Sequence, residues 1–262
     1  MRLKCIITLE KIIQVPPWFR QNLLSLIKEA LIESDEFGDL FFKKWYASNK
    51  SKPFTYSGYF PFKKEGNSVL SRCDHFTFLF STNDEEFLIR VYNGLLKLSS
   101  GSNDFQLFGA KIKKIKCDLL PERKFVSNQE VRFKTLAPFL LRDPANGAFY
   151  LYPLKTFHRV KGELLKFRYW KGVKNEEFKK YLEDNLRKQT GEEVEVIELS
   201  VKEVIPILCG SGNPEHKYVF TCPGIKGTLT LKGSAEAMKL IYDTGIGARR
   251  SNGFGMLEVD VG

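Results

Sequence analysis

Glycines flank a short basic segment near the end of this sequence, in the stretch GIGARRSNGFG. Glycine adopts backbone angles closed to other residues, and successive N–H groups in such a loop form a concavity that favours anions. Arginine guanidinium groups grip phosphate oxygens in pairs. A tight connection with a solvated pair of arginines is the other interpretation. The phosphate interpretation makes these the candidate binding residues: Gly245, Gly247, Arg249, Arg250, Ser251, Gly253 and Gly255.

The surroundings of this loop exclude the common nucleotide-binding motifs. SAEAMKLIYDTG, before the loop, predicts a helix capped at Ser234, and FGMLEVDV, after it, predicts a strand. The P-loop and the dinucleotide fingerprint place their glycines after a strand and before a helix. Here the order is reversed, so a mononucleotide-binding fold is disfavoured. A small-molecule enzyme that holds a phosphate cofactor in this loop is disfavoured for the same reason.

The charge balance points to a polyanionic partner. The 262 residues include 41 Lys plus Arg against 31 Asp plus Glu, a formal net charge of +10. Such a balance favours nucleic acid first and a membrane surface second. No apolar run approaches the roughly 18 residues of a membrane span, and MRLKCIITLEK is too polar for a signal peptide. We therefore expect a cytoplasmic protein that does not enter a membrane.

Cysteine usage predicts reduced thiols and no metal site. Five cysteines are widely scattered, and an odd count without a secretory signal is typical of free thiols. A zinc site would have to use Cys209, His216 and Cys222, which lack the usual Cys-x-x-Cys pairing.

The elements that must position the loop follow the same order twice. The first half predicts strands at 2–10, 53–60, 75–81 and 105–120, with helices at 20–34 and 84–98. The second half predicts strands at 130–142, 194–208, 226–233 and 254–261, with helices at 175–189 and 234–245. Each half reads β-α-β-β-α-β, which predicts an α+β protein of two tandem ferredoxin-like, RRM-like domains with antiparallel sheets, residues 1–122 and 123–262.

The duplication offers an internal comparison for the loop. In the first half its place is taken by SSGSNDFQLFG, which has glycines but no arginines. The basic loop is thus a feature of one half, which favours function over mere connection. RNA-recognition modules share this topology, but their RNP1 pattern is missing here.

With this loop and this duplicated order of elements, the sequence resembles the CRISPR repeat-processing endoribonucleases of the RAMP superfamily. GIG-ARRSN-GFG is similar to their C-terminal loop, which reads Gly-h-Gly, five residues, Gly-h-Gly, where h is apolar. VRFKTLAPFLLR looks like the opening strand of their second domain, and VPPWFRQNLLSLIKEAL looks like their first helix. The resemblance covers essentially the whole chain.

The resemblance implies an antiviral-defence enzyme that cuts a precursor transcript within each CRISPR repeat. The implied chemistry is attack by the RNA's own 2′-hydroxyl, leaving a 2′,3′-cyclic phosphate and a 5′-hydroxyl, with no metal and no cofactor. The implied partners are CRISPR repeat RNA and subunits of a CRISPR effector complex, and the implied state is a monomer or homodimer.

The histidines of this chain depart from that family pattern. Many members carry a catalytic histidine just after the first helix, and segment 40–57 has none. We expect His75, beside two phenylalanines, to be structural and His216, in a Gly/Pro-rich turn, to be exposed. His158 lies in a basic irregular stretch and joins Lys155 and Arg159 as a candidate RNA contact, with a catalytic role as the alternative.

Lysines and tyrosines replace the missing histidine in segment 40–57. The resemblance implies that family members without this histidine cut with lysine and tyrosine side chains. A lysine that stays charged stabilises the phosphorane. We predict Tyr46 as the proton-transfer group and Lys52 as the phosphate stabiliser, with Lys44 and Lys50 completing the catalytic set. A basic face that only holds phosphates remains open, and with it a non-catalytic repeat-RNA-binding subunit of an effector complex. The strand KIKKIK at 111–116 would extend the RNA track.

Overall fold

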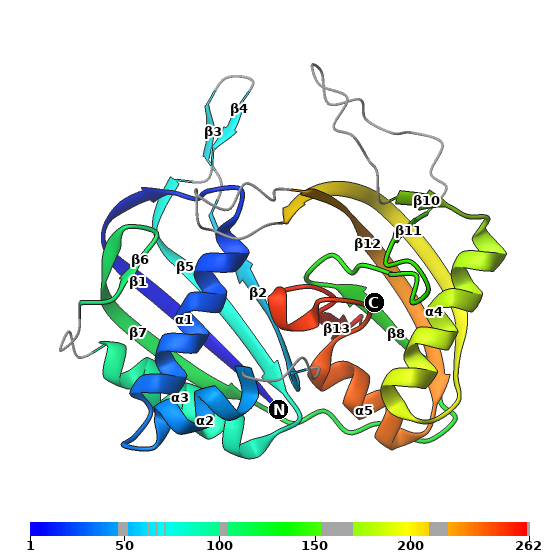
Figure 1. The fold of residues 1–262 in the computed structure, drawn as a ribbon, viewed down its shortest axis with the longest axis horizontal. Helices are drawn as coiled ribbons and strands as arrows, with labels where there is room; N and C mark the ends of the chain where they lie inside the picture. Colours follow the sequence, from blue (N-terminus) through cyan, green and yellow to red (C-terminus); the bar gives the residue numbers. More distant parts are fainter. Residues whose placement is uncertain are drawn as a thin grey trace. The chain divides into compact units, whose positions relative to one another are not determined.

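The computed structural model describes residues 1–46, 52–61, 63–65, 68–70, 72–99, 104–152, 170–209 and 220–260. The chain divides into two compact units (Figure 1). Unit 1 comprises Met1–Glu122 with Ser251–Gly253, and unit 2 comprises Arg123–Arg250 with Phe254–Gly262. Within these described ranges, no helix has both the length and the apolar character needed to cross a membrane.

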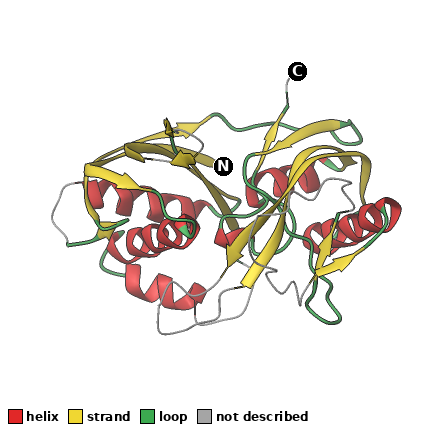
Figure 2. Ribbon diagram, turned by 90° about the horizontal axis from the view of Figure 1, so that it is seen from above, coloured by secondary structure: helices red, strands yellow, loops and turns green. Residues whose placement is uncertain are grey.

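Unit 1 is one antiparallel sheet with helices on one face (Figure 2). The sheet order is β2-β5-β1-β7-β6, and α1 and α3 connect its strands. A nine-residue helix, α2, follows α1, and β3 and β4 form a small separate hairpin. The bounds are β1 (Arg2–Gln14), α1 (Phe19–Glu33), α2 (Gly38–Tyr46), β2 (Phe54–Tyr59), β3 (Lys63–Glu65), β4 (Ser68–Leu70), β5 (Arg72–Thr82), α3 (Glu85–Ser99), β6 (Gln106–Leu107) and β7 (Ala110–Leu120).

Strand alternation explains which face of this sheet is buried. On β1, Leu3, Cys5 and Ile7 are buried, whereas Lys4 and Ile6 are exposed. Successive side chains of a strand point to opposite faces, so the first set faces the helices and the second faces away from them. The buried face is filled largely by phenylalanines of β2, β5 and α3: Phe54, Phe76, Phe78, Phe80 and Phe87.

Unit 2 repeats the arrangement with the strand order β11-β12-β8-β13. Helix α4 packs against β11, and α5 packs against β12. Counting the four main strands of each unit along the chain, both sheets have the order 2-3-1-4, so the chain is two tandem ferredoxin-like folds. The bounds are β8 (Val131–Thr135), β9 (Phe149–Leu151), β10 (Trp170–Gly172), α4 (Asn175–Thr190), β11 (Val194–Cys209), β12 (Phe220–Gly233), α5 (Ala235–Thr244), the 3₁₀ turn η1 (Arg250–Asn252) and β13 (Leu257–Val259).

The helices agree closely with the sequence expectation. The expected helix at 175–189 is α4, Asn175–Thr190, and Phe178, Leu182 and Leu186 form its buried stripe. The predicted cap at Ser234 is confirmed, because its hydroxyl accepts a hydrogen bond from the Ala237 backbone N–H at 3.0 Å.

Two strand expectations were wrong in detail, and one helix was not expected. Helix α2 was not anticipated at all. The strand expected over 105–120 is broken into β6 and β7 by a turn at Phe108 and Gly109, whose φ angles are 56° and 73°. The strand expected over 130–142 ends at Thr135, because the following segment contains Pro138, which has no N–H to donate to a ladder.

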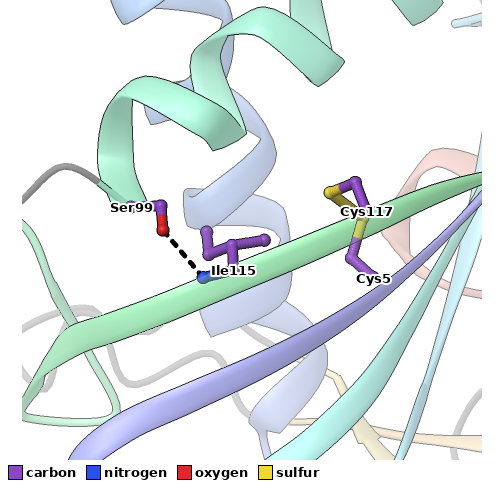
Figure 3. Close-up of a disulfide and its surroundings, with 4 residues drawn as sticks. All are labelled: Cys5, Ser99, Ile115 and Cys117. Atoms are coloured by element: carbon purple, nitrogen blue, oxygen red, sulfur yellow. Dashed lines mark hydrogen bonds between the residues drawn. A yellow bond between two sulfur atoms is a disulfide. The ribbon is translucent and has the colours of Figure 1, made fainter.

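The expectation of reduced thiols was wrong for two cysteines. Cys5 and Cys117 form a disulfide between β1 and β7 (Figure 3). They lie directly opposite each other in the antiparallel register, with their Cα atoms 4.1 Å apart, a proximity that sequence spacing does not reveal. Nearby, the Ser99 hydroxyl accepts a hydrogen bond from the Ile115 N–H at 2.9 Å and ties the end of α3 to β7 (Figure 3). Cys73 and Cys222 are free and buried.

Candidate functional site

The four glycines of the C-terminal loop all have left-handed backbone angles. Their φ values are 76°, 77°, 78° and 72° for Gly245, Gly247, Gly253 and Gly255. A side chain at such an angle is strained, so glycine is the residue that these positions favour. The glycines therefore serve the shape of the loop, whatever the loop binds.

Close packing at the neck of the loop is a second reason for glycine. The Ile246 N–H donates to the Gly255 carbonyl at 2.9 Å, so the two sides of the loop meet there. A Cβ on Gly255 would lie 1.9 Å from the Ile246 carbonyl oxygen, and one on Gly247 would lie 2.3 Å from that of Leu140. The neck consequently has no room for side chains at these two positions.

The two arginines of the loop have different environments. Arg249 has a φ of 59°, which is rare for a residue with a side chain, and its guanidinium carbon lies 5.9 Å from the centre of the Phe149 ring. Arg250 donates from Nη1 to the Thr244 hydroxyl at 3.1 Å. Burial lowers the pKa of Arg250 to about 10, which leaves it charged at neutral pH. Strained backbone is typical of functional sites, so Arg249 strengthens the candidacy of this loop.

The tip of the loop belongs to unit 1. Residues Ser251–Gly253 group with that unit, and the Gly253 carbonyl accepts a hydrogen bond from Nε of Arg20 on α1 at 3.2 Å. An ideal Cβ on Gly253 would lie 2.7 Å from the ring of Tyr56 on β2. The loop tip and the segment that carries the predicted catalytic residues are therefore parts of one unit.

Tyr46, at the end of α2, lies beside two lysines. The ammonium nitrogens of Lys28 and Lys52 lie 5.1 and 5.2 Å from the centre of its ring. Its hydroxyl is buried and has no hydrogen-bond partner among the described residues. Burial raises the pKa of Tyr46 well above its ordinary value. At neutral pH this phenol is therefore protonated, so it can donate a hydrogen bond or a proton but cannot act as a base.

The structure brings only part of the predicted catalytic set together. The Lys52 ammonium lies 5.2 Å from the centre of the Tyr46 ring, so these two predicted residues are neighbours. Lys44 is exposed, and its ammonium lies 6.0 Å from the Phe41 ring centre, while the adjacent Lys43 pairs with Asp39. Lys50, Lys155, His158, Arg159 and His216 lie outside the described residues.

The structural role expected for His75 was wrong. Its side chain is 60% exposed and hydrogen-bonds Asp74 through Nδ1 at 2.7 Å. His75 pairs with Thr8 of β1, on the face of the sheet that points away from the helices. Alternation along β5 therefore places it opposite the buried Phe76 and not beside it.

The same open face of unit 1 carries lysines and an exposed aromatic ring. In an antiparallel sheet, directly paired residues project to the same side. Ile6 pairs with Lys116, Thr8 pairs with Lys114, and Lys4 pairs with Asp118. Tyr59, 67% exposed, pairs with Thr77, which itself pairs with Ile6. We call this set the open basic face: Lys4, Ile6, Tyr59, His75, Lys114 and Lys116.

Sequence reasoning missed two residues of this region, Lys28 and Arg20. Both lie in the helix expected at 20–34, outside the apolar stripe that faces the core. The signal available for them was their position on the polar side of that helix, which many surface lysines and arginines share. Only the packing of α1 against α2 and the loop tip singles them out.

Comparisons with known proteins identify the family. The family model for the C-terminal part of the CRISPR associated protein Cas6 matches residues 120–259, more than half of the chain. Similar solved structures include a CRISPR associated protein Cas6 (TM-score 0.63, 17% identity, 99% of both chains covered) and an RAMP protein binding different RNA substrates (TM-score 0.63, 16%, 99% of both). A Cas6-related protein from Pyrococcus furiosus is also similar (TM-score 0.58, 16%, 100% of this chain and 99% of that one).

At these identities the solved structures establish the fold alone. No curated protein matches the chain by sequence. The family model rests on the sequence itself, and the chain therefore belongs to the CRISPR associated protein Cas6 family.

Proposed function

We propose that this protein is an endoribonuclease that cuts CRISPR repeat RNA without a metal ion. Membership of the Cas6 family is the observation that carries the proposal. The glycine-rich loop with its two arginines and the Tyr46 cluster support it, because cleavage needs groups that grip phosphates and a group that moves a proton. The partner that this chemistry fits is single-stranded or hairpin repeat RNA.

The proposed reaction uses the 2′-hydroxyl of the substrate as its nucleophile. Its oxygen attacks the adjacent phosphorus, the bond to the 5′-oxygen of the next nucleotide breaks, and the products are a 2′,3′-cyclic phosphate and a 5′-hydroxyl. One group must accept the 2′ proton and another must donate a proton to the leaving 5′-oxygen. Cations must stabilise the charge that develops on the phosphorane oxygens.

Tyr46 suits the donor role in this scheme. Its raised pKa keeps it protonated, and Lys28 and Lys52 place two positive charges beside its ring. A buried hydroxyl without a partner costs about 1–3 kcal/mol, and an RNA oxygen would supply that partner once local movement exposes the hydroxyl. Lys52 and Lys28 then stabilise the phosphorane, and the 2′ proton goes to a lysine of the same segment in its neutral amine form, for which Lys44 and Lys50 are the candidates.

RNA binding is assigned to the loop and to the open basic face. Arg249 and Arg250 would hold phosphates at the loop, with Ser251 and the glycine backbone. Lys155, His158 and Arg159 remain predicted contacts. Replacing both arginines by alanine should weaken binding of repeat RNA by about tenfold or more, since each charge-assisted hydrogen bond is worth about 1.5–3 kcal/mol. A double variant of Arg132 and Arg187, two arginines that are already paired with acids, is the matched control.

A repeat-RNA-binding subunit that does not cut is the second candidate. One observation favours it: the Tyr46 hydroxyl is buried in the free protein. The deciding experiment incubates the protein in EDTA with repeat RNA and with the same RNA carrying one 2′-deoxy nucleotide at the cut. A single cut in the first RNA and none in the second supports the proposal. Tight binding without cutting, across several repeats, would replace it with the binding subunit.

A further inference from the structure

Arg20 occupies the centre of a small network at the start of α1. Its side-chain Nε donates to the Gly253 carbonyl at 3.2 Å, although 233 residues separate the two in sequence. Its own main-chain carbonyl accepts a hydrogen bond from the Tyr56 hydroxyl at 2.7 Å. One residue thus contacts both the loop tip and the strand beneath it.

Tyr56 is the third member of this network. The residue is 1% exposed, and a Cβ on Gly253 would lie only 2.7 Å from the nearest carbon of its ring. The loop tip, the Tyr56 ring and Arg20 therefore touch pairwise. Because Tyr56 is buried in the core of unit 1, it gives the tip a fixed base.

Stacking restricts the Arg20 side chain further. Its guanidinium carbon lies 4.6 Å from the centre of the Phe19 ring, and Phe19 packs edge-to-face on Phe60 at 5.1 Å. A guanidinium held over an aromatic face loses little further freedom when it forms a hydrogen bond. Arg20 is therefore preorganised to hold the Gly253 carbonyl.

The same unit carries the proposed proton donor. Lys52, four residues before Tyr56 in the sequence, lies 5.2 Å from the centre of the Tyr46 ring, and the loop tip belongs to this unit as well.

We propose that Arg20 is a positioning residue that locks the tip of the glycine-rich loop, Ser251–Gly253, onto Tyr56. This inference rests on the proposed function for its effect on cleavage, but the locking itself is a property of the free protein. Arg20 acts through the loop and not on the reacting atoms. Its loss would let the tip shift, and a shift of about 1 Å near reacting groups can cost about 10²-fold in rate.

Hydrogen exchange in the free protein tests the lock without any RNA. Arg20→Ala should speed exchange in a peptide covering residues 245–257 by about tenfold or more, while peptides from β1 and β5 keep their rates. Arg20→Lys, which retains one donor, should restore part of the protection. Arg123→Ala removes an exposed arginine and is the matched control. Unchanged exchange of 245–257 in Arg20→Ala would overturn the proposal.

Gly253→Ala provides a second variant that leaves Arg20 in place. Its Cβ would clash with Tyr56, and its φ of 78° is unfavourable for alanine. It should lose the same protection as Arg20→Ala. Retention of full protection in Gly253→Ala would also count against the lock.

Cleavage kinetics then separate positioning from binding. In single-turnover reactions at saturating repeat RNA, Arg20→Ala should be slower by about 10²-fold, while its Kd for RNA changes less than about threefold and Arg20→Lys recovers part of the rate. A Kd that rises together with the rate loss would make Arg20 an RNA contact and overturn the positioning role. If the wild-type protein cuts no repeat RNA, the proposed function fails, and the exchange experiment still decides whether Arg20 locks the loop.

Discussion

The two ferredoxin-like units share a strand order but differ in how their open sheet faces handle charge. On unit 2, Arg132 and Lys134 both lie near Asp260, at 3.4 and 4.0 Å, and Lys226 lies 3.4 Å from Glu203. On unit 1, the acids Glu10 and Asp118 lie on the same strands as Lys4, Lys114 and Lys116, but none of these three lysines forms an ion pair with another described residue. The basic residues of the unit 2 face are therefore paired with acids, whereas those of the unit 1 face keep a positive charge that a polyanion can contact.

The units differ in their aromatic residues as well. Unit 1 holds the tyrosine flanked by lysines, Tyr46, and receives the tip of the loop. In unit 2 the buried Tyr150 stacks on Tyr181 at 4.2 Å and lies near Asp143, an acid that also attracts Lys171 at 3.6 Å. Unit 1 thus places two lysines beside a phenol, whereas in unit 2 the lysine that lies over the Tyr150 ring, Lys171, is paired with Asp143. The difference teaches that fold alone does not locate the chemistry.

Removal of the Tyr46 hydroxyl should have the largest effect and sharpen this contrast. Tyr46→Phe should slow repeat-RNA cleavage by about 10²–10⁴-fold, because it deletes the proposed proton donor, and should leave RNA affinity nearly unchanged. Single-turnover rates and filter-binding affinities measure the two effects. Tyr150→Phe, the corresponding change in a buried tyrosine of unit 2, is the control. Equal losses in both variants would mean that the chemistry does not reside in unit 1.

Reduction of the Cys5–Cys117 disulfide should destabilise unit 1 selectively. A link across 112 residues constrains the unfolded chain, and loops of about this length are worth about 4–5 kcal/mol in the chain-entropy model. Thiol reductant should therefore lower the protection of β1 and β7 against hydrogen exchange, with unit 2 peptides changing little. The double variant Cys5→Ala, Cys117→Ala should not respond to reductant. An equal loss of hydrogen-exchange protection in the two units would contradict a stabilising effect confined to unit 1.

Neutralising the open basic face should weaken RNA binding through salt-dependent contacts. Changing Lys4, Lys114 and Lys116 together to Gln should reduce the slope of log affinity against log salt by about 2, at about 0.7 for each phosphate contact of a single strand. The matched control changes Arg132, Lys134 and Lys226 of unit 2 to Gln, with the same loss of charge. Should both triple variants lose affinity alike, net charge and not the face would be the cause.

The smallest expected effect is a loss of stability at high pH, caused by the buried phenols of unit 1. Burial raises the pKa of Tyr46 and Tyr56 above the ordinary value of 10.0, so the unfolded chain ionises before the folded one. The folded protein then holds more protons, and the free energy of unfolding falls as pH rises above 10.0, by up to about 1.4 kcal/mol per pH unit for each group. Urea unfolding of Tyr46→Phe should show a shallower fall. Tyr59→Phe, at an exposed position, should match the wild type.

Features set by neighbouring residues were predictable from the sequence. The stripe of Phe178, Leu182 and Leu186 and the cap at Ser234 depend on contacts within one or two helical turns. The alternation of β1 and the glycines of the loop belong to the same class, because backbone period and permitted φ angles are local properties. These local patterns indicate the element order β-α-β-β-α-β in each half of the chain, and that repeated order predicts the fold.

Features that join distant parts of the chain were not predictable in this way. The Cys5–Cys117 disulfide and the exposed position of His75 depend on which strands pair and in which register. Lys28 was one polar residue of an amphipathic helix until the packing of α2 placed it beside Tyr46.

The sequence by itself determined the duplicated fold, the basic character, the glycine-rich loop and the tyrosine–lysine segment. Each of these follows from composition or from the spacing of residues within a short segment. Only the tertiary structure decided that Arg20 holds Gly253 and that Lys28 joins Lys52 at Tyr46. The physical reason is that such contacts arise when separate elements pack to bury their apolar faces, and many polar residues on those elements are equivalent until packing distinguishes them.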